Sequence, residues 1–297
     1  GMNIGATTVG GMINNVKTFA SVLMPGVQHM RHTHLPEHKF VKGQPETGLE
    51  MAEDLERIAM NFGGENIAAC IIEPIAGSTG TLVPPKGYLK RIREICDKHG
   101  ILLIFDEVIT GWGRTGSAFA AQEWNVKPDI MTMAKATTNG VVPMGVVAVK
   151  EEIYDAVLDA SSAPEGTPEL FHGYTYSGIP VAVAAALAVQ DIFDKEDIFT
   201  RAKDMSPYLQ DGLQSLKDLK EIVSIRGYGM MGGIEIKMKD KPGKAGYQVF
   251  KHCYDAGVNF KNTGDNLIIA PQFICEKKHI DEIIEKLRTG ISNYAKQ

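Results

Sequence analysis

The sequence has few cysteines, no excess of basic residues and no long apolar run. Its cysteines, Cys70, Cys96, Cys253 and Cys275, lack Cys-x-x-Cys spacing. They are therefore predicted to be free thiols rather than a disulfide framework. The formal charge of -5 and the pI near 5.9 argue against nucleic acid or an anionic membrane as the main partner. Residues 1–21 lack the basic start and apolar centre of a secretory signal, so we expect a cytoplasmic protein.

The most apolar segment, residues 180–189, consists mainly of alanine and valine. It is too short to span a bilayer, which takes about 20 residues in a helix. We therefore predict a buried helix there and no membrane partner. With 297 residues, of which 44% are hydrophobic, the chain is long enough for two domains.

The first two thirds of the chain alternate between predicted strands and helices. Residues 67–72 and 101–105 are short, continuous apolar runs typical of buried strands. Between them, apolar residues at helical spacing over 88–96 predict an amphipathic helix that ends before Gly100. This βαβ unit implies a parallel sheet. Residues 130–133 and 145–149 are expected to add further strands.

The pattern changes after residue 180. We expect a charged helix over 201–219, strands over 222–225 and 233–238, and a closing amphipathic helix over 280–291. The prediction is therefore an α/β fold, in which residues 1–192 form a large cofactor-binding domain with a mostly parallel sheet flanked by helices. Residues 193–297 are predicted to form a smaller C-terminal α+β domain.

Three charged residues are predicted to meet at one edge of this sheet. Asp106 follows the strand over 101–105, Glu73 follows the strand before it, and Lys135 comes shortly after the strand over 130–133. Ligands of open α/β sheets bind outside the carboxyl ends of the strands. A loop lysine alone is usually a surface charge, and an acid after a strand is often a helix cap. Together they suit pyridoxal phosphate, which needs a lysine to form a Schiff base and a carboxylate to keep its ring nitrogen protonated.

Two other patterns do not predict a site. Gly-x-Gly-x-x-Gly occurs at 111–116 and 227–232. A dinucleotide site needs a strand running directly into the glycines and a helix directly out, but the first match lies several residues past its strand and the second runs into a strand. Four histidines lie close together: His29, His32, His34 and His38. Their spacing does not fit a helical pair of zinc ligands and no cysteine completes a set. We therefore predict no metal, and a loop of solvated or substrate-entrance histidines.

Several longer sequence motifs, here called words, follow one another along the chain. They are residues 105–116, 127–130, 134–135 and 142–145, with further words at 72–77, 84–88, 172–178 and 226–232. In order and spacing they resemble class III, fold type I pyridoxal-phosphate aminotransferases. Agreement over many words is far more specific than any single motif.

The resemblance implies a role for each of four residues. Lys135 would be the Schiff-base lysine, Asp106 the partner of the ring nitrogen, and Val108 the apolar residue beneath the ring. Thr175 would reach the cofactor phosphate of a neighbouring subunit, which implies a homodimer. Separately from the resemblance, the position of Glu73 at a strand end before Pro74 predicts that it caps or braces the site rather than takes part in the chemistry.

Words at 23–26, 42–45 and 105–109 look most like ω-amino acid:pyruvate aminotransferases. The implied reaction moves an amino group from an ω-amino acid or amine to a keto acid such as pyruvate. Lys261 stands where the family usually has a carboxylate-clamping arginine, and it offers a point charge without the bidentate fork. Two alternatives stay open: a pyridoxal-phosphate aminomutase, and a catalytically inactive or cofactor-poor fragment of the same fold.

The resemblance extends over roughly the last two thirds of a full-length member. We therefore expect a chain truncated at its N-terminus, in which Gly1 before Met2 would be a cloning remnant. The family's phosphate-binding Gly/Ser loop and its ring-stacking aromatic residue would be missing.

Overall fold

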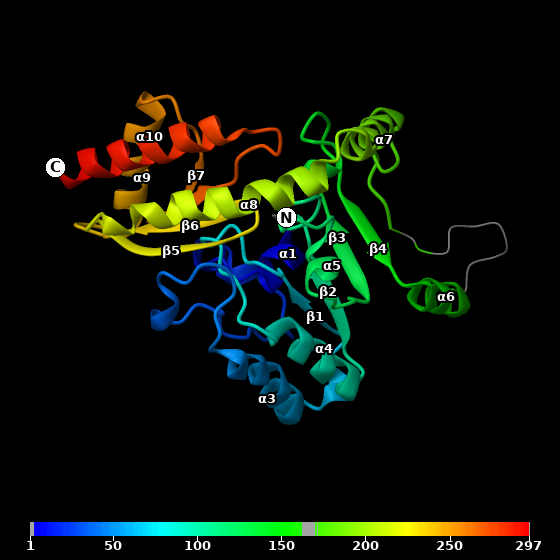
Figure 1. The fold of residues 1–297 in the computed structure, drawn as a ribbon. Helices are drawn as coiled ribbons and strands as arrows, with labels where there is room; N and C mark the ends of the chain where they lie inside the picture. The colour runs from blue at the N-terminus through cyan, green and yellow to red at the C-terminus, as the bar shows by residue number, and fades with distance from the viewer. Residues whose placement is uncertain (1–2, 162–169, 171, 297) are drawn as a thin grey trace.

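The computed structural model describes residues 3–161, 170 and 172–296, and in this part of the chain two four-stranded sheets are each covered by helices (Figure 1). The expectation about Gly1 and Met2 concerns residues outside the described part. The α/β prediction is confirmed.

The first sheet has the strand order β1 (Ala69–Ile72), β2 (Leu102–Asp106), β3 (Ile130–Met133) and β4 (Val146–Val149). β1, β2 and β3 run parallel, and β4 is antiparallel to β3. The sheet is therefore mostly parallel, as predicted, and its strands lie within two residues of the predicted ranges. In this register Asp106 at the end of β2 pairs with Thr132 of β3.

Two helices cover one side of this sheet, α3 (Glu53–Phe62) and α4 (Tyr88–His99). Apolar side chains at helical spacing face inward from both helices and meet those of β1 and β2 in one buried cluster. α4 ends at Gly100, whose φ of +68° is the left-handed cap that glycine adopts readily. The sequence predicted this end correctly.

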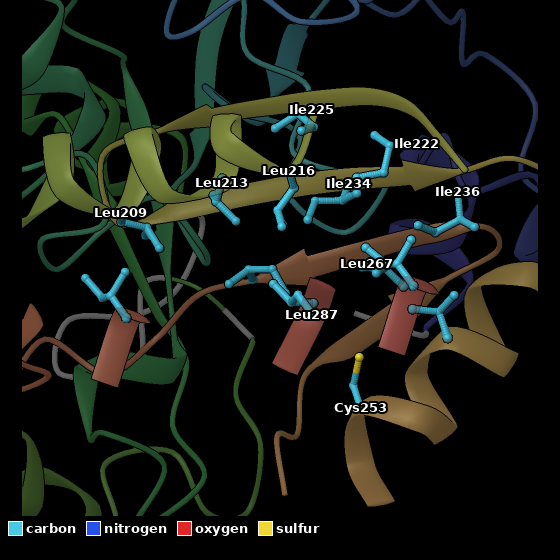
Figure 2. Close-up of a cluster of buried hydrophobic side chains, with 14 of the residues drawn as sticks. Leu209, Leu213, Leu216, Ile222, Ile225, Ile234, Ile236, Cys253, Leu267 and Leu287 are labelled. Atoms are coloured by element: carbon cyan, nitrogen blue, oxygen red, sulfur yellow. The ribbon is translucent and has the colours of Figure 1, made fainter. Parts of the chain in front are cut away.

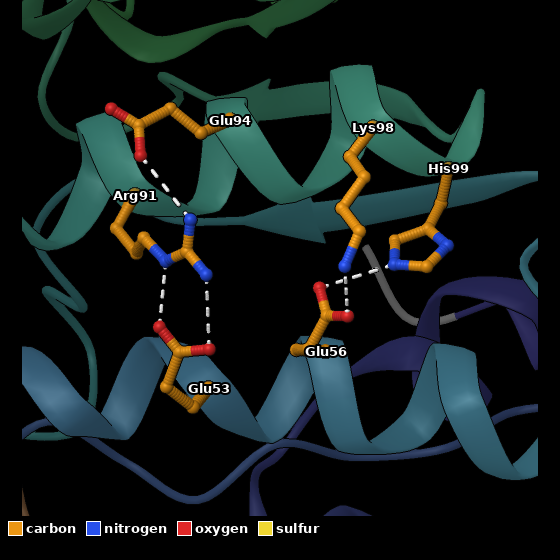
Figure 3. A network of polar contacts seen from close by, with 6 residues as sticks. All are labelled: Glu53, Glu56, Arg91, Glu94, Lys98 and His99. Atoms are coloured by element: carbon orange, nitrogen blue, oxygen red, sulfur yellow. Dashed lines mark hydrogen bonds and ion pairs between the residues drawn. The ribbon is translucent and has the colours of Figure 1, made fainter.

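Charged side chains link the outer surfaces of α3 and α4 (Figure 3). Arg91 donates two hydrogen bonds to Glu53, at 2.6 and 3.1 Å, and His99 contacts Glu56 at 3.1 Å. Lys98 also pairs with Glu56. Solvent-accessible pairs such as Arg91–Glu53 add little stability, so the buried apolar cluster mainly holds the helices in place.

Shorter elements complete the first part: α1 (Ile4–Val9), α2 (Ile13–Thr18), α5 (Ala120–Glu123), α6 (Glu151–Ala160) and several 3-10 turns. The predicted apolar helix is α7 (Pro180–Lys195), but the prediction that it is buried is wrong. Val181 and Leu187 are 56% and 60% exposed. The buried side chains of α7 are Ala182, Ala186 and Phe193, because the helix packs on the described chain along one narrow row.

The second sheet is antiparallel, with the order β5 (Ile222–Tyr228), β6 (Met231–Ile236), β8 (Asn266–Ile269) and β7 (Lys261–Thr263). The helices α8 (Ile198–Gln214), α9 (Lys244–Asp255) and α10 (Lys277–Ala295) surround it. Leucine and isoleucine side chains from the strands and helices fill the space between them (Figure 2). The α+β composition is confirmed, although β7 and β8 were not predicted. The boundary at residue 193 stays a prediction.

All four cysteines are buried and unpaired, which confirms the prediction of free thiols. Among the helices of the described residues, none is both long and apolar enough to cross a membrane.

Candidate active site

The end of β2 fixes the carboxylate of Asp106 through two hydrogen bonds. Its Oδ1 accepts one from the backbone amide of Val108 at 3.0 Å and a longer one from the Thr132 hydroxyl at 3.3 Å. The first bond closes a local turn directly after β2, and the second comes from the neighbouring strand β3. The carboxylate is therefore held at the carboxyl edge of the parallel strands, where the sequence placed it.

Lys135 begins a 3-10 turn (Lys135–Thr137) two residues after the end of β3. Its φ is +50°, in the left-handed region that residues with a Cβ rarely adopt. The Lys135 carbonyl accepts hydrogen bonds from the amides of Thr138 and Gly140, at 3.3 and 3.2 Å. An uncommon backbone conformation held by several bonds is frequent at functional sites.

The ammonium group of Lys135 interacts with three charged neighbours. Burial lowers its pKa, Asp106 and Glu73 act in the opposite direction, and Lys261 lowers the pKa further. Two ammonium groups and two carboxylates therefore share one electrostatic environment, although they come from four separate segments. A lowered pKa leaves more of the lysine as the neutral, nucleophilic amine at a given pH.

Glu73 lies just after β1 and is only partly exposed. Burial raises the pKa of its carboxyl, the Gly77 amide lowers it through a hydrogen bond of 3.0 Å, and Asp106 raises it as a like charge. Because Glu73 fixes the first turn of the following loop, its geometry suits the bracing role that the sequence analysis favoured.

Lys261 reaches this group from the second sheet. It is the first residue of β7, and its Nζ donates a hydrogen bond to the Ser78 hydroxyl at 3.1 Å. Ser78 lies in the same loop as Gly77, which is bonded to Glu73. The loop after β1 therefore has contacts with both Glu73 and Lys261.

Val108 and Thr175, the other two residues predicted for the site, lie at different distances from the charged group along the fold: one is beside Asp106 and the other is in the loop before α7. Val108 lies next to Asp106 in the turn after β2 and is half-buried. Thr175 is exposed in the loop before α7, and no hydrogen bond in the described structure joins its hydroxyl to Lys135 or Asp106. Within one copy of the chain, Thr175 therefore does not join the charged group.

Glu107, next to Asp106, has a structural role. It is fully buried and accepts hydrogen bonds from the Thr110 hydroxyl and from the amides of Ala120 and Ala121. Burial raises the pKa of its carboxyl, and these bonds partly offset that effect. Glu107 follows the last residue of β2 and is not among the charged groups that act on Lys135, whereas Asp106 is.

The two Gly-x-Gly-x-x-Gly words contact each other. The first forms turns after β2, and the second is the hairpin between β5 and β6. The Met230 amide donates to the Arg114 carbonyl at 2.8 Å, and the Arg114 guanidinium donates back to the Met230 carbonyl at 3.2 Å. Residues 107–110 separate the first word from β2, residues 117–119 separate it from α5, and the second word runs into β6. Neither word therefore has a strand running directly into it and a helix running directly out, as a dinucleotide site requires.

Arg226 joins the two sheets, a role that was not predicted from the sequence. Its buried guanidinium donates to the Gly80 carbonyl at 2.9 Å, to the Ser224 hydroxyl at 2.7 Å and to Asn266. It thereby fastens the loop that carries Ser78 to the second sheet. The word 226–232 contained this arginine, but a single sequence does not show which distant carbonyl it meets.

The histidine prediction is wrong for His38, which is buried rather than solvated. Its ring nitrogens contact the Leu35 amide at 3.3 Å and the Thr47 hydroxyl at 3.2 Å. Burial, with a smaller effect of Arg226, lowers the pKa of His34 to about 4. The described residues contain no group of three or more His, Cys, Asp or Glu placed to hold a metal ion.

The sequence and the fold both match known aminotransferases. The family Aminotransferase class-III matches residues 1–291. An omega-aminotransferase of Caulobacter vibrioides is 49% identical over 290 residues, which are 97% of this chain and 65% of that protein. An omega-amino acid–pyruvate aminotransferase of Pseudomonas putida is 41% identical over 291 residues, 96% of this chain and 64% of that protein. The chain thus spans slightly less than two thirds of the length of these relatives.

Solved structures agree with the sequence comparison. A transaminase solved with L-Ala superposes with a TM-score of 0.91 at 30% identity, covering all of this chain and 71% of that one. An omega transaminase from Pseudomonas jessenii in complex with PMP gives a TM-score of 0.90 at 27% identity, covering all of this chain and 66% of that one.

Proposed function

The chain belongs to the class III aminotransferase family, and on that basis we propose that it is a pyridoxal-phosphate-dependent transaminase. Its reaction moves an amino group from an ω-amino acid or amine to a keto acid such as pyruvate. The observation that carries the proposal is the convergence of Lys135 with Asp106, Glu73 and Lys261 at the carboxyl edge of the first sheet. The omega-aminotransferase and the omega-amino acid–pyruvate aminotransferase named above support the substrate class.

The residues present fit pyridoxal phosphate in their chemistry. The group needs an amine for its aldehyde and a carboxylate for its ring nitrogen, and Lys135 and Asp106 provide them within one electrostatic environment. When bound, the cofactor supplies an electron sink for the bond at the substrate's reacting carbon. Asp106 is held by Val108 and Thr132 and so would keep its charge directed at the ring nitrogen, while Val108 would pack beneath the ring.

Lys135 has two tasks in this proposal. Its amine, with a pKa lowered by burial, first holds the cofactor and is then displaced by the amine of the donor. Once free, Nζ would take the proton from the donor's reacting carbon and deliver it to the cofactor carbon C4′. Glu73 braces the loop beside it through Gly77.

Lys261 is proposed to bind the acceptor's carboxylate. Its ammonium is fixed by Ser78 and lies close enough to lower the pKa of Lys135. A keto acid whose carboxylate pairs with Lys261 would therefore have its carbonyl near the amine chemistry. Lysine gives one point of attachment, so the acceptor is held less rigidly than by an arginine fork.

We also propose a cytoplasmic homodimer. Thr175 is exposed and separate from Lys135 within one chain, so it contributes to a site only across a subunit boundary. The exposed apolar side chains of the adjacent helix α7 support such a boundary. Sedimentation at working concentration should give the mass of two chains, and a pure monomer would contradict this part of the proposal.

Reductive trapping tests the central assignment. The protein is titrated with pyridoxal phosphate while its visible absorbance is followed, then reduced with borohydride and mapped by peptide mass. The label should lie on Lys135. Because the ammonium of Lys261 acts on Lys135, it is the competing amine to test: the Lys261→Gln variant should keep the label and Lys135→Gln should lose it. A label on another lysine, with Lys135 unmodified, would refute the proposal, and the absence of any visible band would favour the inactive alternative.

A further inference from the structure

The hydroxyl of Thr137 connects the turn at Lys135 to Trp112. The indole Nε1 of Trp112 donates a hydrogen bond to Thr137 Oγ1 at 3.0 Å. The same hydroxyl donates to the Ala134 carbonyl at 3.0 Å. Thr137 is buried, and Ala134 and Thr137 lie on either side of Lys135 in the chain. One tryptophan N–H therefore acts on a bond that closes the turn containing Lys135.

Trp112 is itself held on several sides. Its ring stacks on Phe193 with centroids 6.0 Å apart and an angle of 12°, and it meets the edge of Phe119 at 5.2 Å. Phe193 continues the packing to Phe199 and Phe273, at 5.3 and 6.4 Å. The indole is thus part of an aromatic cluster that joins the loop after β2 to α7, α8 and the segment before α10.

The backbone of Trp112 also has an unusual conformation. Its φ is +61°, in the left-handed region, as is the φ of +50° at Lys135. The Trp112 amide donates to the Ala118 carbonyl at 2.5 Å, which closes the loop on itself. Bulky residues adopt this region only where their surroundings require it. The Thr137 hydroxyl connects Trp112 to the turn that contains Lys135. The two left-handed residues therefore belong to one hydrogen-bonded arrangement.

From this geometry we propose that Trp112 is a positioning residue for Lys135. Its indole N–H holds the Thr137 hydroxyl, and this bond keeps the left-handed turn that sets where the Lys135 ammonium lies. The inference rests on the proposed function, because it concerns the lysine assigned to the cofactor. The resemblance to class III aminotransferases did not by itself predict a hydrogen-bond donor at Trp112.

The position of Lys135 can be followed through its own titration. The charged groups that face it are Asp106 at the end of β2, Glu73 after β1 and Lys261 in β7. Burial is the largest influence, and it lowers the pKa of Lys135. If the turn relaxes, the ammonium gains solvent and the pKa should rise toward its ordinary value.

The test uses Trp112→Phe, which keeps an aromatic ring but removes the N–H, and Thr137→Val, which keeps the side-chain shape but removes the hydroxyl. Thr137→Ser restores the hydroxyl and serves as the rescue variant. Phe119→Leu is the packing control, because it removes an aromatic neighbour of Trp112 without removing the hydrogen bond. The pKa of Lys135 is measured on cofactor-free protein by NMR of ¹³C-dimethylated lysines, with Lys135→Arg identifying the signal.

Trp112→Phe and Thr137→Val should each raise the pKa of Lys135, by up to about one unit, the ordinary spread among protein lysines. The double variant should show no more than the larger single effect, because both changes break one bond. Thr137→Ser and Phe119→Leu should leave the pKa unchanged. An unchanged pKa in Trp112→Phe and Thr137→Val, or an equal shift in Phe119→Leu, would overturn the inference.

Two further comparisons separate the possible results of this test. If Trp112→Phe does not fold, the comparison of Thr137→Val with Thr137→Ser still decides whether the Thr137 hydroxyl sets the position of Lys135. Reductive mapping of the unsubstituted protein tests the proposed function without any of these variants. The pKa of Lys135 could shift as expected in the variants while borohydride labels a different lysine. Trp112 would then remain a positioning residue for Lys135, and only the cofactor assignment would be refuted.

Discussion

Lys261 donates a hydrogen bond to the Ser78 hydroxyl across 183 positions of sequence. Ser78 belongs to the loop after β1 and Lys261 begins β7, so the second sheet supplies one of the charges around Lys135. The candidate site therefore depends on how the two sheets meet, and Arg226 fixes this meeting by bonding to Gly80 in the same loop.

Replacing Lys261 with arginine should strengthen binding of a keto-acid acceptor. A guanidinium can keep the bond to Ser78 with one N–H and offer others to a carboxylate. One added charged hydrogen bond is worth about 1 kcal/mol, or about fivefold in affinity. The acceptor's dissociation constant and KM should both fall. Lys220→Arg, at an exposed lysine outside the site, is the matched control. An unchanged or weaker acceptor affinity would place Lys261 outside the carboxylate pocket.

Asp106→Asn should leave the fold intact and greatly reduce turnover. The asparagine oxygen can still accept the bonds from Val108 and Thr132, so the main change is the loss of the charge. Losing one fixed electrostatic group typically lowers kcat by about 10²-fold. The comparison is with Asp204→Asn, an exposed aspartate in α8, which should behave as the unsubstituted protein. Near-normal turnover of Asp106→Asn would show that this carboxylate does not serve the ring.

Gly229→Ala should destabilise the contact between the two glycine-rich words. A Cβ at Gly229 would lie 2.2 Å from the Arg114 carbonyl oxygen and 2.8 Å from Thr115 Cα. Gly264 has the same φ of +57° but no neighbour within 4 Å of an added Cβ, so Gly264→Ala isolates the backbone effect. Urea unfolding should show an extra loss of about 1–3 kcal/mol at Gly229, the usual range for overpacking. Equal losses of unfolding free energy in Gly229→Ala and Gly264→Ala would mean that the segment around Arg114 shifts to accommodate the added Cβ at little cost.

The sequence predicted the parts of the fold that depend on local pattern. β1 and β2 lie in the continuous apolar runs 67–72 and 101–105, and α4 has a helical apolar face with a glycine cap. Because parallel strands end at one edge, the closeness of Lys135, Asp106 and Glu73 followed from the strands alone. Of the other residues suggested by the family resemblance, Lys261 lies with this group, and Thr175 does not within one chain.

The errors and omissions involve contacts between distant segments. Periodicity shows that α7 is apolar but not what covers it, and here its apolar side chains are largely exposed. His38 is buried, and its ring nitrogens meet the Leu35 amide and the Thr47 hydroxyl, neither of which the spacing of the histidines indicates. The bond from Trp112 to Thr137 links two loops that local patterns treat as unrelated. Such contacts depend on tertiary packing, which a single sequence does not encode locally.

Asp129 allows a final prediction about stability and pH. It is buried just before β3 and accepts hydrogen bonds from the Leu103 amide and Arg93 at 2.7 Å, with Lys150 at 2.5 Å. Burial alone would raise the pKa of its carboxyl, but the bonds from Lys150, Leu103 and Arg93 outweigh it and hold the pKa below the ordinary 3.8. A carboxyl with a depressed pKa contributes stability above its unfolded pKa, and the contribution disappears as the pH falls through the folded pKa.

Asp129→Asn should therefore lower the free energy of unfolding by about 2 kcal/mol at pH 7, the usual size for hydrogen bonds to a charged group. The difference from the unsubstituted protein should shrink below about pH 4, where the unfolded carboxylate takes up protons. Asp97 pairs with the same arginine at 2.7 Å but is 65% exposed, so Asp97→Asn should change stability little at any pH. Urea unfolding of the three proteins between pH 3 and 7 makes the comparison. A loss at Asp129 that stays constant over this range would show that packing, rather than the carboxylate charge, accounts for its effect.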